Sequence, residues 1–179
     1  MKPKTFWDNF KPDFFADSVY DIDRGWLATR NISAVIVDVD NTIMARYARA
    51  PDSKLRNWVE DLQGSGIKLL AVSNNWTERV RQIAAHLELP LLAPAAKPLG
   101  PAFKNAIAQM GVKAQATVII GDQLFTDILG GNRAGIWTVL VAPISDIDLI
   151  HTKMLRVFER VLLKRLSGRS LVNGSWQET

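Results

Sequence analysis

The stretch "IVDVDNTIM", residues 36–44, joins the pattern of a buried strand to two carboxylates at its end. The apolar, mostly β-branched residues from 33 to 39 predict a strand that is buried on both faces. Asp38 and Asp40 are two positions apart, so in a regular strand their side chains share one face. Just past the strand the backbone can curl and give the two aspartates different surroundings. We therefore expect Asp38 and Asp40 to be functional groups of a site at the end of this strand.

Strand and helix patterns alternate along most of the chain. Near-continuous apolar strands that alternate with amphipathic helices favour a parallel sheet with helices on both faces. The sequence therefore predicts the α/β class, as a Rossmann-like doubly wound parallel sheet. The strands are expected at 33–39, 67–73, 91–94, 116–122 and 137–143, and the helices at 52–63, 78–87, 101–110 and 126–134.

Polar side chains follow four of these strands. Ser73 and Asn74 end the second strand, Lys97 follows the short third strand, and Asp122 ends the fourth. In open parallel sheets, ligands bind outside the carboxyl ends of the strands. We therefore expect these side chains to meet Asp38 and Asp40 in one crevice.

The residue types in this crevice suit reactions at a phosphate group. Of Asp38 and Asp40, one can act as an ionised nucleophile while the other is protonated. Such an asymmetric pair suggests covalent catalysis. Lys97 can hold a phosphoryl oxygen, and Ser73 offers a hydroxyl donor. Asp122 and Asp38 can form an oxygen site for Mg²⁺.

The composition narrows the possible metal chemistry. The chain has 179 residues, which suggests one domain, and it contains no cysteine and two histidines that lie far apart. A thiolate or histidine-rich metal site is therefore not expected, and oxygen ligands suit magnesium. The formal net charge of +4 allows an anionic partner such as a phosphate ester or an anionic lipid.

The two ends of the chain differ from the middle, although we expect a single domain over 1–179. Residues 1–31 form an aromatic segment, with one or two short helices or turns that either pack on the core or contact a membrane surface. Residues 32–150 form the catalytic core. Residues 151–179 hold a basic amphipathic helix and a frayed tail, and this helix either docks on the core or contacts an anionic membrane. Its predicted apolar face is Met154, Leu155, Phe158, Val161, Leu162 and Leu166.

No run of about 20 apolar residues occurs, so we expect no transmembrane helix. The first residues contain aspartates and lack a continuous apolar segment, which is not typical of a signal peptide. With no cysteine, the chain is compatible with a reducing compartment. We expect a cytoplasmic protein with peripheral contact at the inner face of a membrane, and no nucleic-acid partner.

The ordered set of polar strand ends resembles the four motifs of the haloacid dehalogenase (HAD) superfamily of phosphatases. The four matching parts are "DVDNT", Ser73, Lys97, and "GD" at 121–122 followed by Asp127. The finer match is to the YqeG-type phosphatases of HAD subfamily IIIA, which are related to phosphatidylglycerophosphate phosphatase. The stretches that carry it are "KPDFFADSVYDID" (11–23), "VSNN" (72–75), "AKPLGPAF" (96–103) and "GDQLFTDILGGNRAG" (121–135).

The resemblance implies a role for each matching residue. Asp38 would attack phosphorus to form an aspartyl-phosphate, and Asp40 would act as general acid and then general base. Ser73 and Lys97 would hold the phosphoryl oxygens, and Asn74 could add an amide there. The Asp38 carboxylate, the Asp40 backbone carbonyl and Asp122 would bind Mg²⁺. Asn41 and Thr42 would shape the loop, and Asp127 would support the metal's water shell or orient Lys97.

The spacing leaves no room for the cap domain that many HAD enzymes carry, because each gap between motifs holds only a helix and a strand or loop. A capless site should be open, which suits a substrate whose bulk stays outside. The leading hypothesis is a Mg²⁺-dependent phosphomonoesterase with phosphatidylglycerophosphate as substrate. One alternative is a soluble phosphatase for sugar phosphates or nucleotides. Another is an idle HAD-fold binding protein, although idle relatives typically lose an aspartate that is retained here.

Overall fold

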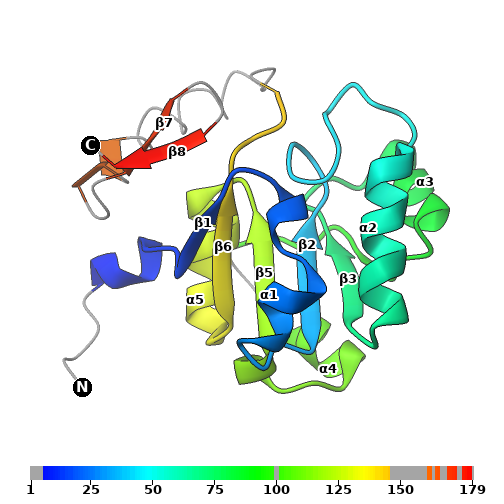
Figure 1. The fold of residues 1–179 in the computed structure, drawn as a ribbon, viewed down its shortest axis with the longest axis horizontal. Helices are drawn as coiled ribbons and strands as arrows, with labels where there is room; N and C mark the ends of the chain where they lie inside the picture. Colours follow the sequence, from blue (N-terminus) through cyan, green and yellow to red (C-terminus); the bar gives the residue numbers. More distant parts are fainter. Residues whose placement is uncertain are drawn as a thin grey trace.

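A computed structural model describes residues 6–98, 101–145, 161–162, 164–165, 169–172 and 175–178. Its centre is a parallel sheet of six strands in the order β1-β6-β5-β2-β3-β4 (Figure 1). The strands are β1 (Phe14–Ala16), β2 (Ala34–Asp38), β3 (Lys68–Val72), β4 (Leu91–Leu92), β5 (Thr117–Gly121) and β6 (Trp137–Val141). The helices are α1 (Arg24–Ala28), α2 (Ser53–Gly64), α3 (Glu78–His86), α4 (Ala102–Met110) and α5 (Leu129–Ala134).

Strand β2, which carries Asp38, lies at the middle of the sheet. It pairs in parallel with β3 on one side and with β5 on the other, so that Val37 is opposite both Ala71 and Ile120. All five residues of β2 are buried, because helices cover both faces of the sheet. The doubly wound α/β fold predicted from the sequence is therefore confirmed.

Alternate residues of β2 belong to different cores. Val35 and Val37 pack in a cluster that includes apolar residues of α1, α2 and α3. Ala34 and Ile36 pack in a second cluster with α4. In Figure 1, α1 and α2 lie on the near face of the sheet, and α4 and α5 lie on the far face. This arrangement leaves the carboxyl edge of the sheet to its loops.

The ends of the helices follow from their capping residues. The side chain of Asp52 accepts a hydrogen bond from Leu55 N at the start of α2, and Thr77 does the same for Val80 N in α3. Gly111, with φ of 62°, ends α4 in the left-handed conformation that glycine tolerates. The predicted helix at 126–134 instead begins as a π-helical turn, η4 (Leu124–Ile128), that leads into α5.

The aromatic N-terminal segment is part of the domain. Short 3-10 turns occupy η1 (Phe6–Phe10) and η2 (Val19–Asp21), as the sequence predicted, but the sequence did not predict β1 between them. β1 has only three residues, too few to show a strand pattern, and it pairs in parallel with β6 at the edge of the sheet. Phe10 is buried, so packing on the core is confirmed for this segment, whereas Phe6 and Trp7 are exposed.

The C-terminal prediction is tested only in part. Residues 161–162 and 164–165 are helical; Leu162 packs against the cluster that contains Phe10 and Leu124, while Val161 is exposed. The rest of the predicted amphipathic helix lies outside the described residues. The prediction of a frayed tail was wrong, because β7 (Arg169–Val172) and β8 (Ser175–Glu178) form an antiparallel pair. Residues 169–172, "RSLV", show no polar–apolar alternation, so the sequence carries no strand signal there.

The described part of the chain shows no cap domain between the predicted motifs. A loop and α2 connect β2 to β3, and α3 and β4 lie between β3 and Lys97. Among residues with a described placement, no helix combines the length and the apolar character that crossing a bilayer requires.

Candidate active site

The loop after β2 gives Asp38 and Asp40 different surroundings. Asn41 takes a φ of 64°, a left-handed conformation that asparagine tolerates, and its N–H donates to Met44 O at 2.7 Å. The side-chain amide of Asn41 also exchanges hydrogen bonds with Ser145, after β6. In this tight loop the two carboxylates have separate partners, although both line the same cavity.

Asp38 faces Lys97, which lies between two carboxylates. Lys97 Nζ is 2.6 Å from Asp38 Oδ1 and 2.7 Å from Asp127 Oδ1, and all three side chains are buried. Burial disfavours the charged form of Lys97, but Asp127 and Asp38 more than offset this effect and hold its pKa above the ordinary value. Lys97 is therefore a permanent cation at this site.

The backbone of Lys97 is also fixed. The Asn74 amide donates from Nδ2 to Lys97 O at 2.9 Å and accepts from Lys97 N at 2.8 Å. This pair of bonds gives Asn74 a positioning role towards Lys97. Its predicted contact with phosphate stays a prediction.

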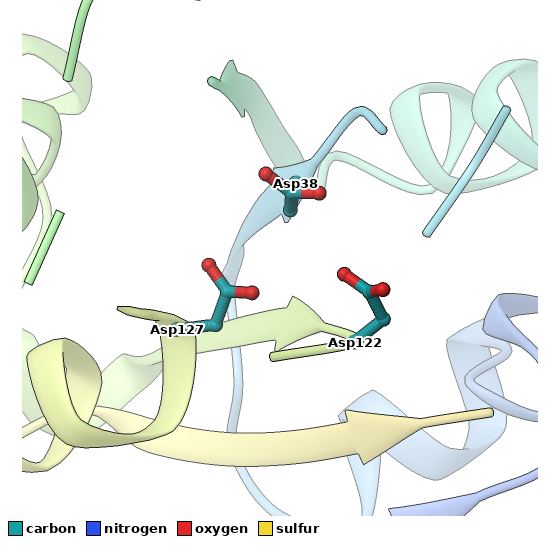
Figure 2. A group of neighbouring side chains, drawn as sticks. All are labelled: Asp38, Asp122 and Asp127. Atoms are coloured by element: carbon teal, nitrogen blue, oxygen red, sulfur yellow. The ribbon is translucent and has the colours of Figure 1, made fainter. Parts of the chain in front are cut away.

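Three aspartates form a cluster beneath the site. Asp38, Asp122 and Asp127 each place a carboxylate oxygen within 4.8 Å of the others, and Figure 2 shows their carboxyl groups facing one another. Thr42 Oγ1 donates to Asp38 Oδ2 at 3.2 Å and approaches Asp122 Oδ1 at 3.3 Å. The structure thus brings together the predicted residues of four separate strand ends.

Gly121 makes the approach of Asp127 possible. A Cβ atom at Gly121 would lie 2.4 Å from the Asp127 carboxyl group, which is too close for any side chain. The π-helical turn η4 presents Asp127 to Lys97, and the N–H of Gln123 donates to the other carboxylate oxygen at 3.2 Å. The glycine before Asp122 is therefore a requirement of this geometry.

The charges of this cluster suit a divalent cation. Burial, followed by repulsion from Asp127 and Asp122, raises the pKa of Asp38 to about 8, although Lys97 acts in the opposite direction. Three carboxylates and one ammonium leave an excess of negative charge in a buried space. Hard oxygen donors at this spacing fit Mg²⁺ and similar ions, and a bound cation would lower the pKa of Asp38.

Asp40 belongs to a second cation–carboxylate pair. Arg79 Nη1 is 2.6 Å from Asp40 Oδ1, and Asn75 Nδ2 donates to the other oxygen of the same carboxylate. Arg79 also donates to Ala48 O from Nε at 2.8 Å and to Ala45 O from Nη2 at 2.7 Å. Arg79 therefore ties Asp40 to the loop that follows β2.

Sequence reasoning missed Arg79. It lies in the first turn of α3, where the helix dipole favours carboxylates over cations. An arginine that the helix dipole disfavours can indicate an acidic partner outside its own helix. The sequence does not show that this partner is Asp40.

A cavity of about 180 Å³ opens between these groups. This volume suits a phosphate group and a few attached atoms. Ser73 Oγ is fixed at its wall, where it accepts from Asn75 N at 3.0 Å. Arg46 is half-buried at this wall, and Gln123 and Thr126 were not predicted. The lining residues are Asp38, Asp40, Arg46, Ser73, Asn74, Asn75, Lys97, Gln123 and Thr126.

Comparison with known proteins places this geometry in a class. The HAD-hydrolase-like family matches residues 94–143. A Bacillus subtilis protein named "Probable phosphatase YqeG" is 37% identical over 169 residues, which cover 94% of this chain and 97% of that protein. Phosphatidylglycerophosphate phosphatase 1 of Arabidopsis thaliana is 29% identical over 160 residues, covering 84% of this chain but 46% of the plant protein.

Solved structures support the same fold at low sequence identity. The cobalt-bound deoxy-D-mannose-octulosonate 8-phosphate phosphatase of Haemophilus influenzae has a TM-score of 0.52 at 19% identity, covering 78% of this chain and 91% of that one. A protein described as a HAD family hydrolase from Streptomyces avermitilis has a TM-score of 0.53 at 22% identity, covering 65% of this chain and 70% of that one.

The fold and these likenesses define a HAD-type phosphatase, which is a hydrolase of phosphomonoesters. HAD phosphatases are generally metal-dependent, and the aspartate cluster is consistent with this property. Within that class the chain belongs to the YqeG family of phosphatases. The family resemblance, the fold class and the enzyme class predicted from the sequence are therefore confirmed.

Proposed function

We propose that the protein is a Mg²⁺-dependent phosphomonoesterase that works through an aspartyl-phosphate on Asp38, with phosphatidylglycerophosphate as its substrate. The observation that carries the chemical proposal is the placement of Asp38. Its Oδ1 is held by the Lys97 ammonium at 2.6 Å, and its carboxyl group lines the cavity. A carboxylate fixed in this way can attack phosphorus without first changing its position.

Lys97 and Ser73 are suited to bind the phosphoryl group. Lys97 is held by Asp38 and Asp127 and also lines the cavity, so its charge can offset the negative phosphoryl oxygens. The Ser73 hydroxyl accepts from Asn75 N, which leaves its proton available to a substrate oxygen. Asn74 supports this binding indirectly because it fixes the peptide of Lys97.

Asp40 is suited to proton transfer. Its carboxyl group lines the same cavity as Asp38 but has different partners, Arg79 and Asn75. In the first step Asp40, which must then carry a proton, gives it to the leaving oxygen as the ester P–O bond breaks and the bond from Asp38 to phosphorus forms. In the second step it takes a proton from the water that releases phosphate from Asp38.

Asp38, Asp122 and the backbone carbonyl of Asp40 are proposed to hold Mg²⁺, with Asp127 also within reach of the cluster. When bound, Mg²⁺ would supply positive charge that offsets the repulsion between a dianionic ester and the aspartates. Thr42 supports two of these carboxylates through its hydroxyl group, and Asn41 supports the loop that carries Asp40.

The lipid substrate is supported by the relatives and by the size of the cavity. The Arabidopsis relative is named as a phosphatidylglycerophosphate phosphatase, and this chain aligns with about half of its length. A cavity of about 180 Å³ accepts the terminal phosphate and leaves the rest of a large substrate outside. Arg46, at the cavity wall, is suited to contact the second phosphate of that lipid, the phosphodiester.

The proposed setting follows from the same substrate. A single-domain enzyme in the cytoplasm, in peripheral contact with the inner face of a membrane, could reach a lipid phosphate.

A substrate panel tests this proposal. The wild type and Asp38→Asn would be assayed with phosphatidylglycerophosphate in detergent micelles, with sugar phosphates, with nucleotides and with a generic phosphate ester. We expect wild-type kcat/KM to be highest for the lipid, and Asp38→Asn to lower turnover of every ester by about 10⁴-fold or more. Equal wild-type values across the panel would favour a general phosphatase, and an active Asp38→Asn variant would overturn the nucleophile assignment.

A further inference from the structure

Exposed apolar side chains occur on loops next to those that line the cavity. Tyr47 is 67% exposed, Trp76 is 55% exposed and Ile144 is 51% exposed. Each of them belongs to a loop at the carboxyl edge of the sheet, where the cavity opens. We call these three side chains, together with Arg49, the rim.

The rim is attached directly to the cavity wall. Arg46 and Asn75 line the cavity, and the next residue in each loop, Tyr47 or Trp76, is an exposed aromatic residue. Ile144 is joined to the nucleophile loop, because its N–H donates to Asn41 O at 3.0 Å. The rim and the cavity wall therefore share the same loops.

The loops of the rim are fixed relative to each other. The Arg79 guanidinium donates to Ala45 O and Ala48 O, on both sides of Tyr47, and Arg79 itself stands three residues after Trp76. Arg81, in the same helix, places its guanidinium carbon 5.2 Å from the centre of the Trp76 ring. The aromatic side chains are thus exposed on a preformed surface.

The charge of the rim favours an anionic partner. Residues 41–51 contain Arg46 and Arg49 and no carboxylate. Aromatic side chains next to arginines are typical of protein surfaces that insert into the headgroup region of an anionic bilayer. By contrast, the buried carboxylates of the site lie below the mouth and are offset by Lys97 and Arg79.

We propose that the rim is the surface through which the enzyme docks on an anionic lipid bilayer, with Tyr47 and Trp76 inserted among the headgroups. This inference rests on the proposed lipid function and adds a location for membrane contact. Docking at the rim turns the cavity mouth towards the bilayer, so a phosphate in the headgroup layer can reach Asp38 without leaving the membrane.

The test compares two double variants by co-sedimentation with vesicles of equimolar phosphatidylglycerol and phosphatidylcholine. The rim variant carries Tyr47→Ser and Trp76→Ser. The matched control carries Phe6→Ser and Trp7→Ser, which also removes two exposed aromatic side chains, but from η1, where no residue lines the cavity. Turnover of a generic soluble ester shows whether each variant has an intact site.

We expect the rim variant to bind vesicles about tenfold more weakly than the wild type, and the control to lose less affinity. Hydrolysis of phosphatidylglycerophosphate embedded in the vesicles should fall by a similar factor, while turnover of the soluble ester stays within about twofold. Wild-type binding to vesicles of phosphatidylcholine alone should be weaker, because the arginines then meet no net negative charge.

Three outcomes would overturn the docking surface. The rim variant could bind vesicles as tightly as the wild type, or only the control could lose affinity, which would assign docking to η1. The wild type could also fail to bind vesicles, as expected if the rim contacts a phosphoprotein or a second copy of the chain. Failure of the proposed lipid function gives a different result from failure of the docking surface. In that case the wild type would bind vesicles but would not hydrolyse phosphatidylglycerophosphate in detergent micelles.

Discussion

Lys97 and Arg79 each place a cation within 2.7 Å of an aspartate of the site, yet their surroundings differ. Lys97 is the inner cation: its side chain is 2% exposed, and its ammonium contacts two carboxylates. Arg79 is the outer cation: its side chain is 21% exposed, and it contacts one carboxylate and two backbone carbonyl groups. The difference lies in the cations, because Asp38 and Asp40 are equally buried, at 7% side-chain exposure each, and both line the cavity.

This difference matches two chemical tasks. The proposed nucleophile and its phosphate-binding cation benefit from fixed positions in a mostly buried place, where charges interact strongly. The proposed proton donor and acceptor, Asp40, must exchange its proton with water and substrate, and its partner Arg79 is the more exposed of the two cations. The inner pair should therefore control stability and turnover together, and the outer pair should control turnover with less effect on stability.

The largest effect is expected from removal of the inner cation. Lys97→Met leaves Asp38, Asp122 and Asp127 without a neutralising charge, so we expect it to abolish turnover and to lower the free energy of unfolding by about 3–5 kcal/mol. Urea unfolding in the presence of a chelator measures this loss. Lys68→Met is a matched control, since Lys68 makes one hydrogen bond, to Met110 O, and its loss should cost about 1 kcal/mol. Equal losses in the two variants would contradict a special role for the inner pair.

A smaller but selective effect is expected at Gly121. Gly121→Ala places a methyl group where the Asp127 carboxyl now lies, so the aspartate cluster must shift. We expect Mg²⁺ affinity, measured by titration calorimetry, to fall about 10–100-fold. Gly64→Ala is the control, because a Cβ there meets nothing within 4 Å. Unchanged affinity in Gly121→Ala would mean that the cluster is not the metal site.

Removal of the outer cation should affect the rate more than the fold. Arg79→Met leaves Asp40 without its ion pair and frees the loop at Ala45 and Ala48, so we expect kcat to fall about tenfold to 10²-fold. KM for a generic ester should change little, and the free energy of unfolding should fall by about 1–2 kcal/mol. Arg79→Lys, which can keep the charge but not all three bonds, should recover part of kcat. A larger loss of stability than in Lys97→Met would reverse the comparison.

The last prediction concerns the pH dependence of stability. The pKa of Asp38 is raised from 3.8 to about 8, so between these values the folded protein holds a proton that the unfolded chain has lost. The free energy of unfolding of the metal-free protein should therefore fall as pH rises through this range. Mg²⁺ favours ionised Asp38, so it should raise the thermal midpoint by a few degrees more at high pH than at low pH. A cation effect independent of pH would contradict coupling between Asp38 and the metal.

The part of the site around Lys97 was predictable because its residues lie at the ends of strands. Asp38, Ser73 and Asp122 each follow an apolar strand, and the topology of a parallel sheet brings such ends together. Lys97 was found in the same way, after the short strand β4. Contact between Asp127 and Lys97 was one of two roles that the family resemblance implied for Asp127. Its geometry needed the structure, because it depends on the π-helical turn and on the missing side chain of Gly121.

The outer half was less predictable because its contacts come from side-chain direction. Arg79 is one of many surface arginines in the sequence, and only the course of the 45–48 loop brings it to Asp40. Strand β1 escaped prediction because three residues show no period, and the pairing of β7 with β8 depends on contacts between two short segments. Local pattern therefore predicts the parts of the fold that bury apolar surface, and tertiary contacts decide the rest.

The most direct test of the central assignment is to trap the phosphorylated enzyme. The wild type would be mixed with a fast-reacting phosphate ester and Mg²⁺, quenched in acid within the first turnover, and mapped by mass spectrometry with Asp40→Asn as a variant that should release phosphate slowly. We predict one added phosphoryl group on the peptide that contains residues 36–44, located at Asp38, with more of it in Asp40→Asn. A phosphoryl group on another side chain, or turnover with no phosphorylated peptide in either protein, would contradict Asp38 as the nucleophile.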